Sequence, residues 1–273
     1  MSARFQLRIQ RYGWDKASDC YEDLWGRQVE PARGALLEMA GLQAGERVLD
    51  MACGPGPIAL AAAARVGSTG FVLGADISDR MVERAGAAAR REGVTNVAFV
   101  RADAETEVAA PGAFDVALCS LGLMYAPNPR VALRRLRDAV RPGGRAAVAV
   151  WGARKQCGWA EIFPIVDARV ESAVCPMFFQ LGTGDALEHE LARAGFGNIK
   201  TQRLNVELWY ESAEQAVGAA FAGGPVALAY ARFDEAVRRS AEAEYLGSIE
   251  RYRRGSGYAL PGEFVVAAAE RVG

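Results

Sequence analysis

The feature that most constrains the fold is a Gly/Pro cluster between a short apolar run and an alanine-rich segment. Residues 48–52, VLDMA, predict a buried strand, and residues 58–66, IALAAAARV, predict a helix. The linking residues CGPGP predict a tight turn, and its glycines let the backbone approach a ligand closely. The helix that follows exposes N–H groups without intrahelical partners. The turn is therefore a candidate ligand-binding loop at the end of a strand.

The strand and helix pattern repeats along the next hundred residues. Further strands are expected at residues 70–76, 97–103, 114–120 and 145–151, and further helices at 78–93 and 127–140. The RPGG sequence after residue 140 should end the last of these helices and lead into the fifth strand. Alternation of this kind predicts an α/β fold of the Rossmann-like type, in which a parallel sheet is covered by helices on both faces.

The segments outside this core predict a single domain, 1–273, with additions at both ends. We expect a helical cap over 1–45, a core over 46–151 and a cover over 152–273. Within the cover, residues 152–182 predict irregular or short helical structure. After them come a helix at 185–196, a strand at 198–210, a helical insertion at 211–254 that is broken at Gly223, Gly224 and Pro225, and a final short strand after the Pro-Gly turn within 260–272.

Charge and cysteine content exclude several classes of protein. Lys and Arg number 32 against 33 for Asp and Glu, so no general positive field attracts nucleic acid, and the arginines of 134–141 are spaced as a solvated helix face. Five scattered cysteines without a C-x-x-C pair predict neither a disulfide framework nor a metal site. Residues 1–10 lack the apolar core typical of a leader peptide, and no apolar stretch has the length of a membrane span, so we expect a cytoplasmic protein. Its oligomeric state stays open, a homodimer included.

The glycine turn alone fits two kinds of ligand. Gly54, Gly56 and Ala59 match the dinucleotide pattern G-x-G-x-x-A, and Asp76 ends the next strand at the distance expected for a ribose-binding acid. Asp50 argues against that interpretation, because an acid at the strand end would repel a pyrophosphate. It could instead accept hydrogen bonds from the turn or from a ligand ammonium. Asp103, after the third strand, stands where an adenine amino group would need an acceptor.

Taken in order, the motifs VLDMACGPG, GADIS, RADAE, FDVALCSLGLMYAPN and RPGGR resemble those of class I S-adenosylmethionine-dependent methyltransferases. The resemblance covers residues 47–151 and is strongest to the small-molecule branch that includes the ubiquinone and menaquinone biosynthesis C-methyltransferases. It implies a seven-stranded, mostly parallel sheet with an antiparallel last strand. Ala52 departs from the family, which often has glycine there. The implied cofactor is S-adenosylmethionine, released as S-adenosylhomocysteine, and the implied partner is a small-molecule methyl acceptor.

The cofactor-binding residues that the resemblance implies are Asp50, Ala52, Gly54, Gly56, Asp76, Ile77, Met81, Asp103, Ala104, Cys119 and Ser120. The first four would cradle the methionine part, and the last two would border it. Asp76 would accept from the ribose hydroxyls. Ile77 and Met81 would pack on the adenine, and Asp103 with Ala104 would receive its amino edge.

The remaining candidates concern the acceptor side. Trp14 and Tyr21 are either core aromatics or a flap over the sulfonium, whose charge an aromatic face attracts. Tyr125 is the best-placed candidate for a catalytic group, with a packed loop residue as the alternative. His189, the only histidine, lies on a helix expected to be at the surface, away from the ligand. A histidine base is therefore not expected, and alignment with exclusion of water would carry the reaction at a carbon, oxygen or nitrogen acceptor.

Three functions follow from these observations. The first is a methyltransferase acting on a small, apolar or aromatic metabolite. The second is an NAD(P)-dependent oxidoreductase, and the third is a non-catalytic protein that binds S-adenosylmethionine. For the methyltransferase, residues 1–30, 152–182 and 211–254 are expected to form a mobile lid, with a static cap as the alternative.

Overall fold

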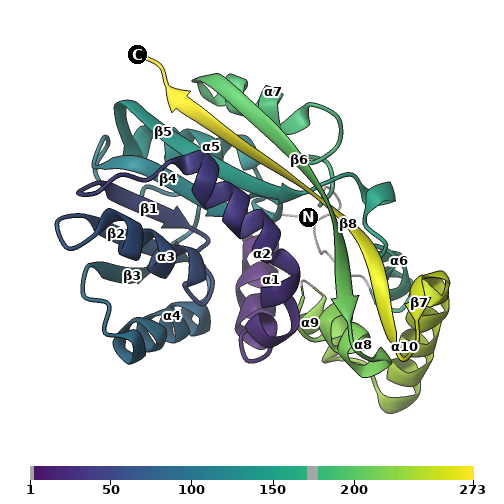
Figure 1. Ribbon diagram of the computed structural model, residues 1–273. Coiled ribbons are helices and arrows are strands. Elements are labelled where there is room, and N and C mark those ends of the chain that lie inside the picture. The colour runs from purple at the N-terminus through teal and green to yellow at the C-terminus, as the bar shows by residue number, and fades with distance from the viewer. Residues whose placement is uncertain (1–2, 171–177, 225) are drawn as a thin grey trace.

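A computed structural model of the protein describes residues 3–170, 178–224 and 226–273. Its centre is one sheet in the order β3-β2-β1-β4-β5-β8-β6, with the two-residue strand β7 paired to β8 (Figure 1). The strands are β1 Arg47–Met51, β2 Phe71–Asp76, β3 Val97–Arg101, β4 Phe114–Ser120, β5 Val140–Trp151, β6 Phe196–Tyr210, β7 Arg253–Arg254 and β8 Gly257–Arg271. Strands β1 to β5 are parallel, and β8 runs antiparallel to both β5 and β6. The predicted Rossmann-like sheet is confirmed, with β7 as one strand more than expected.

Helices flank the sheet along its length. Two of them, α1 and α2, precede β1, and α3, α4 and α5 alternate with the parallel strands. Their bounds are α1 Ala3–Ala17, α2 Tyr21–Ala40, α3 Pro57–Val66, α4 Asp79–Glu92, α5 Pro129–Ala139 and α7 Ala186–Ala194. The Ser78 hydroxyl caps α4 by accepting from the backbone N–H of Met81 at 3.1 Å. This cap fixes the start of α4 directly behind the end of β2, where the candidate site lies.

The C-terminal part extends the sheet beyond the parallel core. Figure 1 shows β6 and β8 as long paired strands that leave the core and reach a group of helices. These helices are α6 Ile162–Asp167, α8 Ala213–Phe221, α9 Ala227–Tyr230 and α10 Glu235–Ile249. Helix α1 packs against α9, so the N-terminal helix contacts the helical group of the C-terminal part. In the described part of the chain, no helix is long and apolar enough to cross a membrane.

Three boundaries differ from the sequence predictions. Pro261 and Gly262 form no turn, because β8 runs straight through them as one long strand. At Pro261, β8 pairs with β6 but has not yet reached β5, whose pairing with β8 begins at Phe264, so one side of the strand needs no ladder hydrogen bond and proline is tolerated. Strand β5 begins at Val140, before the Pro-Gly-Gly sequence, and Phe196 belongs to β6 and not to the preceding helix. Part of the expected cover, 171–177, lies outside the described residues.

Candidate active site

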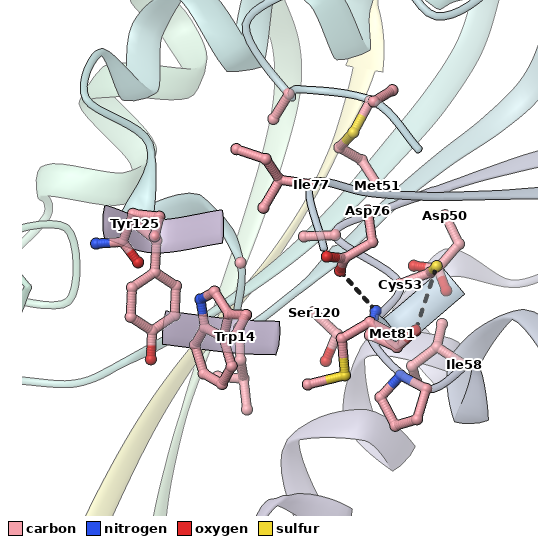
Figure 2. Close-up of a pocket in the computed structure, with 18 of the residues that line it drawn as sticks. Trp14, Asp50, Met51, Cys53, Ile58, Asp76, Ile77, Met81, Ser120 and Tyr125 are labelled. Atoms are coloured by element: carbon pink, nitrogen blue, oxygen red, sulfur yellow. Dashed lines mark hydrogen bonds between the residues drawn. The ribbon is translucent and has the colours of Figure 1, made fainter. Parts of the chain in front are cut away.

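A cavity lies at the carboxyl ends of β1, β2 and β4, with α1 and α2 on its other side. The empty space along its walls, open solvent included, is about 940 Å³. Figure 2 shows how side chains from these separate strands point into the same space. The predicted site residues that line it are Trp14, Tyr21, Asp50, Ala52, Gly54, Asp76, Ile77, Met81, Asp103, Ala104, Ser120 and Tyr125.

Two predicted residues are not part of the cavity wall. Cys119 is fully buried, because successive side chains of β4 point to opposite faces and it is Ser120 that faces the cavity. Gly56 has φ 95°, and a Cβ there would stand 3.0 Å from the Cβ of Ala85. Gly56 therefore serves the close approach of the turn to α4, while Gly54 is the glycine that faces the cavity.

Asp76 joins the glycine turn to the end of β2. Its two carboxylate oxygens accept from the backbone N–H groups of Gly54, at 2.8 Å, and Ser78, at 2.9 Å (Figure 2 shows the first). Burial raises the pKa of Asp76 to about 6, against the effect of those backbone hydrogen bonds. Each carboxylate oxygen can accept a second hydrogen bond. The side chain thus holds the turn in place and keeps acceptor capacity for ligand hydroxyls.

Asp50 is a buried acid whose carboxylate makes no hydrogen bond of ordinary geometry within the described part of the chain. It is 0% exposed at the end of β1, and neither of its oxygens has a hydrogen-bond partner among the described residues. Burial, and next the charge of Asp76, raise the pKa of Asp50 to about 8. The turn therefore does not satisfy this carboxylate, which was one of the two expectations from the sequence. A cationic ligand group is the partner that such an acid lacks.

Arg33 is a cavity residue that the sequence did not single out. It comes from α2, is 6% exposed, and its guanidinium donates to both carboxylate oxygens of Glu22 at 2.7 and 2.8 Å. Because a guanidinium carries five N–H donors, some remain for a ligand carboxylate. A buried cation and the buried acid Asp50 thus line the same cavity. Together they can hold a group that carries an ammonium and a carboxylate, as an amino acid does.

Aromatic rings form the side of the cavity opposite the acids. The ring of Trp14, on α1, meets that of Tyr21 edge to face at 5.6 Å and that of Tyr125 at 5.0 Å between centroids. Tyr125 in turn meets Phe178 at 5.3 Å. Trp14 and Tyr125 appear side by side in Figure 2. The rings can exclude water and can also face a positive charge.

His189 is exposed on α7, as expected. It lines a second, open cavity that shares Ala126 with the first, together with Arg130 and Glu190. Arg130 and Glu190 pair with each other at 2.8 and 2.9 Å. The loop after β4 extends to α7 and forms this second cavity with it, while no α7 residue lines the first cavity. His189 does not line the first cavity.

Comparison with known proteins agrees with this arrangement. Residues 42–168 match the family model of a methyltransferase domain. The chain is 35% identical over 134 residues to aklanonic acid methyltransferase DauC of Streptomyces sp. (strain C5), which covers 49% of this chain and 61% of DauC. It is 29% identical over 230 residues to nocamycin O-methyltransferase of Saccharothrix syringae, covering 77% and 80% of the two chains.

A third relative belongs to the branch that the motifs indicated. The ubiquinone/menaquinone biosynthesis C-methyltransferase UbiE of Ectopseudomonas mendocina is 39% identical over 113 residues, 41% of this chain and 44% of UbiE. The aligned part thus spans less than two thirds of DauC and of UbiE. Among solved structures, phosphoethanolamine N-methyltransferase 2 of Haemonchus contortus shares the fold, with a TM-score of 0.63 and 18% identity over 100% of this chain and 60% of that one.

Proposed function

We propose that the chain is a class I S-adenosylmethionine-dependent methyltransferase and that it methylates a small, apolar or aromatic molecule. The observation that carries the proposal is a buried acid and a buried guanidinium that line the same cavity. Neither oxygen of Asp50, at the end of β1, has a hydrogen-bond partner among the described residues, and Arg33 brings its guanidinium from α2. The amino-acid end of S-adenosylmethionine has the ammonium and the carboxylate that these two groups need.

The other cavity residues fit the rest of the cofactor. Asp76 has acceptor capacity left for the ribose hydroxyls, next to the N–H of Gly54. Ile77 and Met81 offer apolar surface for the adenine, and Asp103 lies beside them in the loop after β3. One Asp103 oxygen accepts from the backbone N–H of Glu105 at 2.9 Å, which orients the carboxylate. The second oxygen remains for an adenine amino group.

The methyl transfer depends on the alignment of the acceptor with the methyl group and on the exclusion of water. When bound, S-adenosylmethionine supplies an activated methyl group on a sulfonium, so the protein need not form a covalent bond to it. Trp14 and Tyr125 hold the acceptor in line and keep water out of the path of transfer. Tyr125 is a polar group in the aromatic wall, and it is the residue we assign to catalysis. The accepting atom is a carbon, oxygen or nitrogen.

The apolar or aromatic class of the methyl acceptor is supported by the residues of the cavity wall and by the substrates named for two related proteins. The rings of Trp14, Tyr21 and Tyr125 give this side of the cavity an apolar surface. Two relatives are named for the methylation of aklanonic acid and of nocamycin. We also propose that the reaction takes place in the cytoplasm, since the four described cysteines are all free thiols, as in a reducing compartment.

Calorimetric titration tests the cofactor assignment against the two other functions. We expect binding of S-adenosylmethionine and S-adenosylhomocysteine and none of NAD(P), because a pyrophosphate has no cationic group to pair with Asp50 and would oppose its ionisation. Tight binding of NAD(P) without binding of S-adenosylhomocysteine would favour the oxidoreductase. Binding without turnover in a screen of acceptors would favour the non-catalytic protein.

A further inference from the structure

A small aromatic cavity adjoins the cofactor cavity. It shares four wall residues with it, namely Trp14, Tyr21, Leu121 and Tyr125. Its far side is formed by Trp25, Val29, Trp151, Trp159, Gly223 and Gly224. About 20 Å³ is open to the centre of a water-sized sphere, which is room for one small group and not for a ring.

Trp159 leaves a polar atom unsatisfied at this place. Its side chain is 2% exposed, and its indole Nε1 has no hydrogen-bond partner among the described residues. The neighbouring Trp25 is different, because its Nε1 donates to the carbonyl of Ala219 at 2.9 Å. A buried donor without a partner is unfavourable and uncommon in folded proteins. The Trp159 N–H is therefore a buried donor without a partner among the described residues, on a side chain that lines the small cavity.

Packing keeps the Trp159 ring in place. Its centroid lies 5.4 Å from that of Trp25, 4.9 Å from that of Trp151 and 5.7 Å from that of Phe178. A ring held from several sides presents its N–H in a fixed direction and loses little entropy when a ligand binds. No charged side chain lines this small cavity in the described part of the chain, so an ionised ligand group would be desolvated without compensation.

We propose that this cavity binds an oxygen substituent of the methyl acceptor, with the Trp159 N–H as its hydrogen-bond donor. The proposal rests on the proposed function, because it places the acceptor ring at the mouth of the cavity beside Trp14 and Tyr125. The oxygen is uncharged and accepts a hydrogen bond, as a ketone, quinone or ether oxygen does. Trp159 thus selects oxygenated over unsubstituted apolar acceptors.

Two probes that differ only in the oxygen test this role. 1-Tetralone and tetralin share one bicyclic skeleton, and only the first carries a carbonyl. With S-adenosylhomocysteine bound, the wild-type protein should bind 1-tetralone more tightly than tetralin, by roughly threefold to tenfold, the range of one neutral hydrogen bond. Trp159→Phe keeps an aromatic ring without the N–H and should abolish that preference. Trp209→Phe, outside the cavity, is the matched control and should retain it.

If Trp159→Phe does not fold, an NMR measurement on the wild-type protein tests the proposal without the variant. In protein labelled with ¹⁵N at the indoles, 1-tetralone should shift the Nε1–H resonance of Trp159 downfield, and tetralin should not. Equal preference in the wild type and in Trp159→Phe, an unshifted Trp159 resonance, or no binding of either probe would overturn the proposal. If S-adenosylhomocysteine itself does not bind, the proposed function fails instead, and the two failures are distinguishable in the same titration.

Discussion

A Cβ placed on Gly122 would stand 2.3 Å from the Cβ of Ala52, so the loops that follow β1 and β4 touch each other at the cavity wall. Ala52 itself has φ 58°, in the left-handed region that favours glycine. The contact explains why a small residue is needed on both loops. Alanine at position 52 is small enough to fit the turn after β1. Glycine at position 122 leaves room for the methyl group of Ala52.

The first prediction concerns this contact. Gly122→Ala should destabilise the protein by about 1–3 kcal/mol, as overpacking does, and should weaken binding of S-adenosylhomocysteine because both loops line the cavity. Denaturant unfolding and calorimetry measure the two effects. Gly34→Ala in α2 is the control, since no atom lies within 4 Å of its added Cβ and it should not destabilise. Unchanged stability of Gly122→Ala would show that the loops move apart freely.

The second prediction concerns Asp76. Asp76→Ala should weaken S-adenosylhomocysteine binding by about 1–3 kcal/mol, because it loses charged acceptors for two hydroxyls. It should also lower the free energy of unfolding, because the carboxylate holds the N–H groups of Gly54 and Ser78. Asp138→Ala, which removes a surface partner of Arg137, is the control with unchanged affinity. Full affinity in a folded Asp76→Ala protein would refute the ribose assignment.

The third prediction concerns the proton on Asp50. Its pKa of about 8 means that the free protein carries Asp50 largely neutral at pH 7, whereas pairing with an ammonium favours the ionised form. Binding of S-adenosylhomocysteine at pH 7 should therefore release a proton, which calorimetry detects as a dependence of the heat on the buffer's ionisation enthalpy. Asp50→Asn should bind more weakly and lose this Asp50 contribution to proton release. Equal proton release by the two proteins would contradict the role of Asp50.

The same pKa predicts how stability changes with pH. Because the folded protein binds the Asp50 proton more tightly than the unfolded chain, whose Asp pKa is about 3.9, this group's contribution falls as pH rises from about 4. It levels off above about pH 8. Asp76, with a pKa of about 6, acts in the same sense over a narrower range. Urea unfolding of wild type and Asp50→Asn across this range should show a shallower decline in the variant.

The fourth prediction concerns the lid. Helix α1 carries Trp14 and contacts the α4 region, where the Ser78 hydroxyl donates to the Asp15 carboxylate at 2.6 Å, and Arg84 pairs with Asp19, just after α1, at 2.5 Å. The Arg84–Asp19 ion pair is exposed, and such pairs contribute little, so opening has to break chiefly the Ser78–Asp15 hydrogen bond. Hydrogen exchange in α1 should be fast in the free protein and slow when S-adenosylhomocysteine is bound. Protection equal to that of β1 and β4 in both states would indicate a static cap.

Local patterns were enough to predict the parallel core and most of the cavity wall. The turn after β1 and the acids after β2 and β3 follow from the strand-helix alternation, which brings their side chains to one sheet edge. Arg33 could not be found that way, because its burial depends on α2 packing across the sheet, and an arginine in a helix usually indicates solvent. The low exposure of Arg33, which pairs with Glu22 eleven residues earlier in α2, is set by the packing of the helix in the tertiary structure.

Two other features that the sequence did not predict, the extended backbone at Pro261 and Gly262 and the surroundings of the Trp159 N–H, also arise from tertiary structure. Pro261 and Gly262 predict a turn locally, yet pairing with β6 keeps β8 extended through them. From the sequence, Trp159 cannot be told from an ordinary core tryptophan. Only the structure shows that its N–H has no partner among the described residues. Hydrogen-bond partners that come from distant segments cannot be predicted from spacing in a single sequence.

Transfer of a labelled methyl group tests the central claim most directly. The protein would be incubated with methyl-labelled S-adenosylmethionine and a cell extract, and the products identified by mass spectrometry, with Asp50→Asn in parallel. The account predicts label in a small, apolar product made by the wild type, and a strongly reduced yield with Asp50→Asn. Label in protein or nucleic acid, or no labelled product while NAD(P) binds tightly, would contradict it.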